Sequence, residues 1–589
     1  MIALMRSSHR ALSLLALTFI MLLGAAWVLV ADAAPSSPVA KGPARLGGAE
    51  SFRLLQQADS SYRAKNWIVA AELYARLSAN DSTNGHVWQN EAWCMYQLER
   101  FSEASSFFQR AVALGGGRPG QSPASSNAYN VACCEARAGH RDAALAWLQR
   151  SLDMGYAPRS GIAEDGDLAS LRSDPRFAGL AYPGVATAAG RDAGWRSDLD
   201  YLVSEIHRLH AVYRTEPLPP GFDAELASLR RDIPRLGDGD VAVRLQGLLA
   251  RLGDGHSGVR MMGSRVGFHT LPLKTFLFPE GLRVFSAPAA YAKLTGRNVV
   301  GLGGQPLAVL LERLRPYVSR DNDMGVAWSA PRFLSSIEVL HALGCVADST
   351  GVDVETEDPS GQRETVHVAP SAHAASPHMD KLMPPEGVAK APLYLRHVDN
   401  TFWSEPLENG HVMYVQFNQV MDKPEERLAA FALRLRDQLA QGGVTDVIVD
   451  VRHNNGGNAM VLDEFVRTLT TFDAMHPGRH LYVITGRATF SAAQVFINRV
   501  EAGTNAVFVG EPSSSRPDFV GEDTEVRLPF SGLVTTVSSR RHFIDGWDTR
   551  AWIAPTLSAA PTAADYFSGR DAALEAVLEL MREGAKVPQ

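Results

Sequence analysis

The chain has 589 residues, of which 46% are hydrophobic and 21% charged, and its formal net charge is −7. This length exceeds what one hydrophobic core supports, so several domains are expected. The composition is typical of globular protein. A negative balance without a basic stripe argues against a nucleic acid as partner.

Residues 1–33 have the organisation of a signal peptide. Arg6 and Arg10 precede an apolar run from Ala11 to Val30, which ends in a small-x-small site at Ala33. This pattern predicts cleavage after Ala33 and export, to the periplasm or the outside of the cell. The apolar run is also long enough to span a bilayer. An uncleaved membrane anchor therefore stays open, and membrane contact is expected only in that case.

A flexible linker at 34–48 and helical repeats at 49–180 are expected next. The segments Trp67–Tyr74 and Phe101–Phe108 align with an offset of thirty-four residues, and Asn127–Leu152 forms a third unit. The pattern resembles tetratricopeptide repeats. Such repeats offer a groove for a protein partner or act as a spacer, and the sequence leaves both open.

Residues 191–260 are expected to form a helical lead-in, because Leu202, Ile206 and Leu209 recur at helix spacing. The segment ends in a Gly-Asp-Gly-His-Ser-Gly loop that carries His256. Small neighbours leave the imidazole accessible. His256 is therefore a candidate general base.

Residues 265–370 predict a β module. Short apolar strands at 275–278, 281–285 and 298–302 are followed by a Gly-Gly turn and a helix, and 351–370 reads as a hairpin. The arrangement resembles a degenerate PDZ module. Capture of a peptide terminus and a purely structural role both remain open.

The core is expected at 394–589. A strand at 412–417, a helix at 425–441 and buried strands at 447–451 and 481–484 alternate along the chain. This rhythm predicts a partly parallel sheet, and hence a multidomain α/β protein. Shorter strands at 525–528 and 534–538 and a closing helix at 571–581 follow.

Ser491 opens a helix directly after the strand at 481–484. Backbone N–H groups are unpaired there and the helix dipole is positive, which favours an alkoxide or an oxyanion. A simple helix cap is the alternative interpretation. Gly456 and Gly457 follow the strand at 447–451 and let the backbone approach a ligand. Their N–H groups are candidates for one half of an oxyanion hole.

Four motifs occur in order: GDGHS at 253–257, DVRHNNGG at 450–457, ATFSAA at 488–493 and VGEPSSS at 509–515. Together they resemble the tail-specific, or carboxyl-terminal-processing, serine peptidases and their tricorn-core relatives. The resemblance covers about two thirds of the chain. It implies a mixed α/β, crotonase-like core and a Ser491 nucleophile. It also implies oxyanion donors from the Gly456-Gly457 loop and the N–H of Ala492.

The chain departs from the processing branch at the base. The lysine expected after the serine is replaced by Arg516, and the only lysine downstream of Ser491 is Lys586. A guanidinium stays protonated, so it cannot take the serine proton. The tricorn-like branch uses a histidine, which His256 matches, although Gly255 replaces the serine that precedes it there. The acid that orients the imidazole is left open among Asp254, Glu522, Asp523, Asp545 and Asp548.

The sequence therefore predicts an exported serine endopeptidase that cleaves unfolded or small peptides through an acyl-enzyme. A non-catalytic ligand- or partner-binding protein on the same fold is the alternative. No cofactor or metal is expected, since neither Cys-x-x-Cys nor clustered histidines occur. The four cysteines are expected to be buried, with a Cys94 bridge to Cys133 or Cys134 left open.

Overall fold

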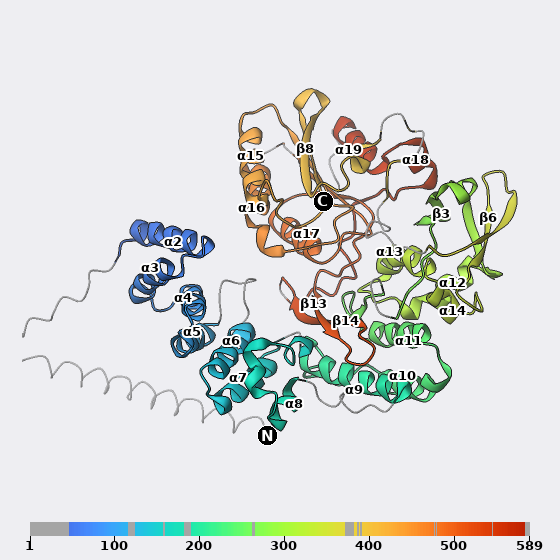
Figure 1. The fold of residues 1–589 in the computed structure, drawn as a ribbon. Coiled ribbons are helices and arrows are strands. Elements are labelled where there is room, and N and C mark those ends of the chain that lie inside the picture. Colours follow the sequence, from blue (N-terminus) through green and yellow to red (C-terminus); the bar gives the residue numbers. More distant parts are fainter. Residues whose placement is uncertain are drawn as a thin grey trace, which may run out of the picture. The chain divides into compact units, whose positions relative to one another are not determined.

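The computed structural model describes residues 46–583, apart from 116–123, 157–158, 182–189, 262–265, 372–381, 386–387, 389–390, 476–477, 479 and 545. The expected signal peptide and most of the expected linker lie outside the described residues. The chain forms two compact units, Met1–Ser82 and Thr83–Gln589 (Figure 1). Within the described part, no helix is long and apolar enough to cross a membrane.

The first unit contains helices α2 (Gly48–Arg63) and α3 (Trp67–Asn80). The ring of Tyr62 packs edge-on against Trp67 and Tyr74, with centroids 5.3 and 6.3 Å apart. The hydroxyl of the buried Tyr74 donates to Asp59 at 2.7 Å. The two helices thus form a hairpin with an aromatic interface.

The second unit begins with two more helical hairpins, made of α4 (Gly85–Gln97), α5 (Phe101–Ala113), α6 (Ala124–Arg137) and α7 (Arg141–Asp153). Glu99 and Gly139 have positive φ angles of 59° and 84° in the turns of these hairpins. Alanines at the expected close-packing positions are fully buried, namely Ala92, Ala104, Ala111 and Ala144. Paired helices are therefore present where the repeat pattern predicts them. Helix α8 (Pro175–Ala181) follows.

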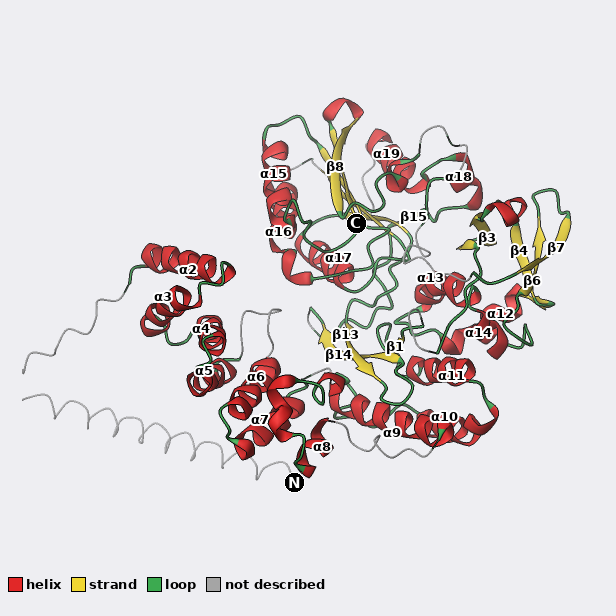
Figure 2. Ribbon diagram, in the orientation of Figure 1, coloured by secondary structure: helices red, strands yellow, loops and turns green. Residues whose placement is uncertain are grey.

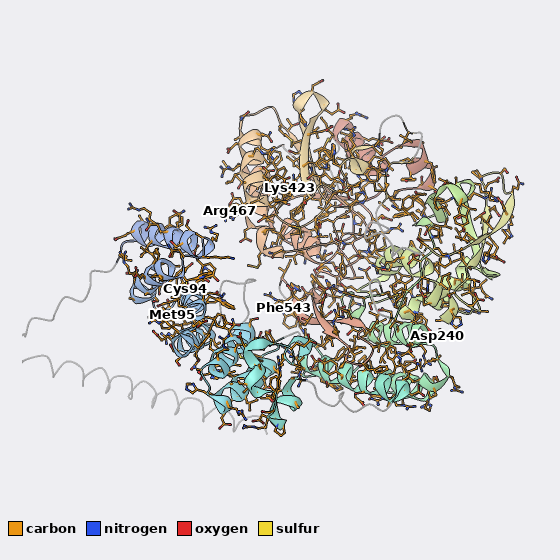
Figure 3. All side chains as sticks on the ribbon, viewed as in Figure 1. Cys94, Met95, Asp240, Lys423, Arg467 and Phe543 are labelled. Atoms are coloured by element: carbon orange, nitrogen blue, oxygen red, sulfur yellow. The ribbon has the colours of Figure 1, made fainter. Side chains whose placement is uncertain are left out.

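All four cysteines are buried free thiols, including Cys94, which Figure 3 labels. Burial raises the pKa of Cys94 to about 12 and that of Cys345 to about 11. The prediction of buried cysteines is confirmed. The bridge left open between Cys94 and Cys133 or Cys134 does not form.

The lead-in consists of α9 (Arg191–Leu209), α10 (Phe222–Asp232) and α11 (Asp238–Ala250). The expected stripe of α9 is buried, at Leu202, Ile206 and Leu209. It shares a core with strands β13 (Phe519–Arg527) and β14 (Val534–His542). These strands are longer than predicted. They form a separate sheet of order β1-β14-β13 with β1 (Gly258–Val259), the strand that begins two residues after His256 (Figure 2).

The β module is antiparallel, with order β2-β3-β4-β6-β7 and β5 beside β4. Its strands are β2 (Lys274–Phe278), β3 (Gly281–Ser286), β4 (Asn298–Leu302), β5 (Gln305–Pro306), β6 (Val352–Glu357) and β7 (Arg363–Val368). Helices α12 (Leu307–Leu314), α13 (Asp323–Leu334) and α14 (Ile337–Ala342) complete its core. The predicted strands and the hairpin are confirmed, and the module is PDZ-like in architecture.

The main sheet has the order β15-β12-β11-β10-β9-β8. Its strands are β8 (Phe402–Leu407), β9 (Val412–Phe417), β10 (Asp446–Asp450), β11 (His480–Thr485), β12 (Val507–Gly510) and β15 (Leu557–Ser558). All neighbours pair in parallel except the edge strand β8, which pairs antiparallel with β9. The partly parallel sheet and the multidomain α/β class are confirmed.

Helices cover both faces of this sheet because successive strand residues point to opposite faces. On one face, Val447 and Val449 share a core with α15 (Leu428–Ala440), α16 (Asp463–Met475) and α17 (Ala492–Gly503). On the other face, Ile448 packs with α19 (Ala572–Glu583). A short helix, α18 (Ala563–Ser568), precedes α19. Burial on both faces explains why the strands read as continuous apolar runs.

Candidate active site

Ser491 occupies a strained turn between β11 and α17. Its φ and ψ angles are 56° and −121°, a conformation that non-glycine residues rarely adopt. Its side chain accepts no capping hydrogen bond. The turn is fixed by Thr489, whose hydroxyl donates to the Val451 carbonyl at 2.9 Å and accepts from the Gly486 N–H at 3.1 Å. Because of this strained conformation at the first turn of the helix, the hydroxyl of Ser491 does not cap the backbone of the helix.

The imidazole of His256 meets this hydroxyl. Nε2 of His256 lies 2.9 Å from Oγ of Ser491, across 235 residues of sequence. Pairing of β1 with β14, which matches Gly258 with Thr536, brings the histidine loop to the site. The two residues predicted to act as base and nucleophile are thus brought together.

The loop of His256 is held by a buried carboxylate, Asp254. Its Oδ1 accepts the N–H groups of His256 at 2.9 Å and Ser257 at 2.7 Å. Its Oδ2 lies 3.1 Å from Nε2 of the buried His210, and the hydroxyl of Ser538 donates to Oδ1. Burial acts to raise the pKa of Asp254, but the hydrogen bonds from His210 and Ser538 outweigh it and lower the pKa. Asp254 is therefore an anion that organises backbone.

Two phenyl rings sandwich the imidazole. The ring of Phe490 lies 4.4 Å from that of His256 at 25°, and the ring of Phe519 lies 5.7 Å away at 12°. Burial lowers the pKa of His256, while the charges of Asp254 and Asp523 and the backbone of Val520 act in the opposite direction. The net lowering favours the neutral imidazole at pH 7, which is the form that accepts a proton.

No carboxylate orients the ring among the described residues. Nδ1 of His256 is buried and no carboxylate bonds to it there; the backbone of Val520 is the acceptor that acts on the ring. Of the five acids left open by the sequence, Asp254 binds backbone, and Asp545 lies outside the described residues. The remaining three have other partners: Asp523 pairs with Arg260, Glu522 lies 4.0 Å from His542, and Asp548 pairs with Arg550.

The backbone beside Ser491 carries the predicted oxyanion donors. A Cβ on Gly456 would lie 2.8 Å from Cβ of Ser491 and 3.0 Å from the nitrogen of Ala492, so this glycine packs directly on the turn. Its N–H donates to Oδ1 of Asn454 at 3.0 Å, so this predicted oxyanion donor already has an acceptor in the structure. Within the described part of the chain, the N–H groups of Gly457 and Ala492 donate to no protein atom.

The sequence departs from the family that it resembles at Arg516 and at Gly255, and each of these residues has a defined environment in the structure. The guanidinium of Arg516 donates through Nε to the backbone carbonyl of Asp321 at 2.8 Å. A Cβ on Gly255 would lie 2.7 Å from the ring of Phe490. A serine there would collide with the ring that stacks on His256, so the aromatic sandwich and the missing serine belong together.

A cavity of about 540 Å³ opens beside the imidazole. Its wall includes His256, Phe490 and the backbone of β1, together with apolar and hydroxyl side chains from the β module, namely Phe268, Thr270, Phe333 and Ser336. This volume is in the range of ligand-binding pockets in proteins. The cavity thus gives access to the side of the site on which His256 lies.

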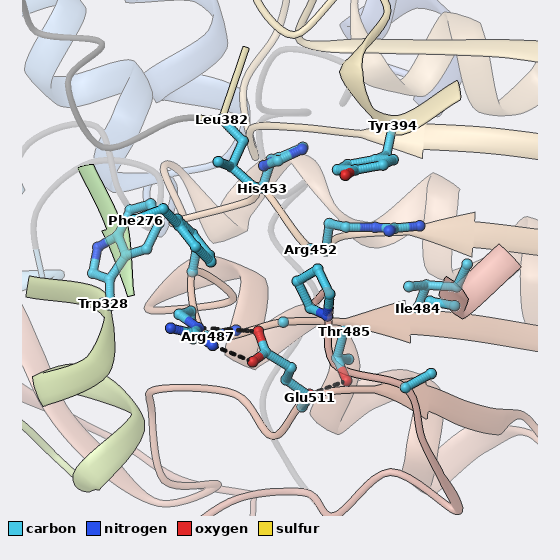
Figure 4. Close-up of a pocket in the computed structure, with 15 residues that line it drawn as sticks. Phe276, Trp328, Leu382, Tyr394, Arg452, His453, Ile484, Thr485, Arg487 and Glu511 are labelled. Carbon is cyan, nitrogen blue, oxygen red and sulfur yellow. Dashed lines mark hydrogen bonds and ion pairs between the residues drawn. The ribbon is translucent and has the colours of Figure 1, made fainter. Parts of the chain in front are cut away.

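A second cavity, of about 30 Å³, holds roughly one water molecule. Figure 4 shows that charged side chains line it, among them Arg487, which pairs with Glu511. Arg452 also lines it and pairs with Asp450 and Asp571 at 2.7 Å each. These buried pairs tie β10 and β12 to neighbouring segments and carry no free group for catalysis.

One group of potential metal ligands occurs among the described residues. Cys133, Asp165 and Asp167 bring ligand atoms within 4.8 Å of one another. The carboxylate of Asp165 already accepts from Tyr129 at 2.6 Å, and that of Asp167 accepts from Arg137 at 2.8 Å and from Tyr96. The group lies among the repeat helices, outside the Ser491 site.

No family model matches the chain, and no curated protein matches it. Among solved structures it is similar to mature CPAF, with 13% identity, 67% of this chain and 99% of the other covered, and a TM-score of 0.49. It is also similar to the photosystem II D1 C-terminal processing protease, with 15% identity, 64% and 98% covered, and a TM-score of 0.32. Similarity to the tricorn protease has 13% identity, 67% and 37% covered, and a TM-score of 0.32. The structures to which the chain is similar thus include serine peptidases.

Proposed function

We propose that this chain is a serine peptidase in which Ser491 is the nucleophile and His256 the general base. The observation that supports this proposal most directly is the 2.9 Å separation between Nε2 of His256 and Oγ of Ser491. This separation is within reach of proton transfer. The strained backbone of Ser491 supports the same assignment, because it presents the hydroxyl at the positive end of a twelve-residue helix.

The proposed reaction begins when Oγ of Ser491 attacks a peptide carbonyl and its proton passes to Nε2 of His256. The new oxyanion accepts hydrogen bonds from the N–H groups of Ala492 and Gly457. The imidazolium then protonates the leaving amine, and the acyl-enzyme forms. A water molecule, deprotonated by the same imidazole, releases the acid product.

The cavity beside His256 supports the substrate class that we propose. The cavity of about 540 Å³ beside His256 has room for several side chains of an extended or unfolded peptide. We therefore propose endopeptidase activity on unfolded or small peptides, outside the cytoplasm as the first 33 residues predict, with the helical repeats as a surface for a protein partner.

A test uses a fluorophosphonate probe, with mass spectrometry to locate the adduct. Wild type is expected to label on Ser491, and Ser491→Ala and His256→Ala are expected to lose at least about 10⁴-fold in rate. Ser106→Ala, in a repeat helix, is the control and should label like wild type. A wild-type protein that never labels, even with peptide present, would refute the proposal.

The alternative is a ligand- or partner-binding protein on the same fold. One observation favours it: Nδ1 of His256 has no carboxylate partner among the described residues, unlike the usual triad. In that case the cavity would hold a ligand without turnover. Tight binding of a peptide that remains uncleaved, with no labelling of Ser491, would distinguish this function.

A further inference from the structure

Asp321 is a buried carboxylate between the loop of His256 and the loop after β12. It lies just before α13, and its side chain is 4% exposed. Its Oδ1 accepts the N–H of Gly255 at 2.8 Å. The hydroxyl of Ser515 also acts on this carboxyl in the direction that favours ionisation, and Oγ of Ser515 accepts the N–H of Ser491 at 3.1 Å. Asp321 thus binds the base loop directly, and Ser515, whose hydroxyl acts on its carboxyl, binds the backbone of the nucleophile.

The backbone around Asp321 is fixed by the segment that follows β12. Nε of Arg516 donates to the carbonyl of Asp321 at 2.8 Å. The side chain of Asn322 donates to the carbonyls of Ser513 at 3.1 Å and Ala551 at 2.7 Å. These contacts hold the carboxylate against Gly255 from the opposite side of the site.

Two carboxylates share the backbone of the histidine loop. Asp254 accepts the N–H groups of His256 and Ser257, and Asp321 accepts that of Gly255. Asp254 has the imidazole of His210 as a partner. Oδ2 of Asp321, in contrast, is buried with no hydrogen-bond partner among the described residues. The loop is therefore anchored by two carboxyls: Asp254, whose negative charge has the imidazole of His210 as a partner, and Asp321, one of whose oxygens has no partner in the described part of the chain.

We infer that Asp321 is a positioning residue of the site, whose ionised carboxylate holds the His256 loop against the Ser491 turn. The inference rests on the proposed function. An ionised carboxylate is a much stronger acceptor for the Gly255 N–H than a protonated one. Protonation of Asp321 therefore loosens the loop and lengthens the contact between His256 and Ser491.

The charged groups around Asp321 place this change near neutral pH. Burial and then the charge of Asp254 raise the pKa of Asp321 to about 7, while the N–H of Gly255, Ser515 and the guanidinium of Arg516 act in the opposite direction. The pKa of Asp254 is lowered, so the two carboxyls titrate far apart. Between pH 6 and 8, Asp321 is the anchor that changes charge.

The test measures the rate of phosphonate labelling of Ser491 from pH 5 to 9 in wild type and in Asp321→Asn. Asparagine has the shape of the protonated acid. In wild type, the labelling rate is expected to rise twice with increasing pH. The first rise, at a pH below the ordinary imidazole pKa, reports loss of the proton from His256, and the second, near pH 7, reports loss of the proton from Asp321. Asp321→Asn is expected to lack the second rise and to label about tenfold more slowly at pH 8.

Asp198→Asn is the matched control. Asp198 is also a buried carboxylate that accepts two backbone N–H groups, those of Phe530 at 2.8 Å and Ser531 at 2.9 Å. It anchors the turn between β13 and β14, and its variant should keep both rises. A fold defect alone would affect the two variants alike.

Hydrogen exchange provides a readout that does not depend on the reaction. At pH 8, the peptide covering residues 252–259 should exchange about tenfold faster in Asp321→Asn than in wild type. If wild type labels, and Asp321→Asn keeps both the two-step profile and wild-type exchange, the inference is wrong while the proposed function stands. If wild type never labels, the proposed function fails and the positioning role fails with it.

Discussion

The Ser491 turn and the His256 loop meet at one hydrogen bond, yet they are built by opposite means. The turn is local: strand β11, the turn and helix α17 follow one another within 480–503. The loop depends on distant partners, since Ser538 lies 284 residues from Asp254 and Asp321 lies 66 residues from Gly255. The elements that carry the nucleophile are therefore contiguous in sequence, although Val451, Gly456 and Ser515 also contact the turn. The base loop, in contrast, is anchored by side chains of distant segments.

The difference extends to how each side chain is oriented. Ser491 is held by backbone strain and by the packing of Gly456 against its Cβ. His256 is held by the two rings of Phe490 and Phe519 instead of a carboxylate. Stacking fixes the plane of the imidazole but adds no negative charge at Nδ1. The base thus depends on burial to stay neutral and on the neighbouring anions to stabilise its charged form.

The largest effect is expected from a substitution that distorts the Ser491 turn and leaves the His256 loop intact. In Gly456→Ala, the new methyl group would lie 2.8 Å from Cβ of Ser491, at a backbone φ of +112°. Displacement of the hydroxyl by a fraction of an ångström should slow phosphonate labelling by about 100-fold. Labelling kinetics with circular dichroism at matched concentration would measure the loss in a folded protein.

Gly443→Ala separates strain from collision. Gly443 has a φ of +93° with no atom within 4 Å of its Cβ position, so the variant should lose about 1 kcal/mol of stability and keep the wild-type rate. Equal losses of rate in the two glycine variants would contradict the role of Gly456 in positioning the nucleophile.

A smaller effect is expected from loosening the loop. Ser538→Ala removes the hydroxyl that donates to Asp254 and that accepts from the hydroxyl of Ser257 at 3.1 Å. The His256 loop should become more mobile, and labelling should slow by about tenfold. Ser539→Ala is the neighbouring control on β14, since its hydroxyl contacts Thr524 and the Glu522 carbonyl instead. If both serine variants label alike, the anchoring of Asp254 does not matter.

The smallest effect concerns the aromatic sandwich. Phe519→Leu opens one side of the imidazole to water, so burial lowers the pKa of His256 less than in wild type. The acid limb of the labelling rate should then move to higher pH, toward the ordinary imidazole value of about 6.5. The rate at pH 8 should fall by only about threefold. Phe530→Leu, at the far turn of the same hairpin, should leave the profile unchanged, and an unshifted limb in Phe519→Leu would argue against the sandwich.

This contrast explains which parts of the structure the sequence predicts. The strand, turn and helix around Ser491 are contiguous, so apolar runs and turn residues predict them correctly. The same holds for the hairpin β6–β7 and the stripe of α9. In these segments the spacing of apolar residues along the sequence predicts which side chains are buried.

What the sequence does not predict depends on contacts across the chain. Strand β1 has two residues, too few for any periodicity, yet its pairing with β14 delivers His256. In the long strands β13 and β14, buried and exposed residues alternate only weakly, because part of each strand is exposed. Of the acids that the sequence leaves open for His256, the four within the described residues contact other groups, and the rings of Phe490 and Phe519 stack on the imidazole.

The pairing of one predicted oxyanion donor has a readable signal in the sequence. The N–H of Gly456 donates to Asn454, two residues earlier. Asparagine commonly accepts the N–H of the second residue after it, as in an Asx-turn. The dipeptide Asn454-Asn455 before the glycines therefore favours Gly457 as the free donor.

The most direct test is a crystal structure of the protein after reaction with a phosphonate probe. Phosphorus should be bonded to Oγ of Ser491, with a phosphonyl oxygen within hydrogen-bond distance of the N–H groups of Ala492 and Gly457. Nε2 of His256 should lie on the opposite side of that phosphorus, within hydrogen-bond distance of Oγ or of the leaving-group position. An adduct on another residue, or an imidazole turned away from Ser491, would contradict the account.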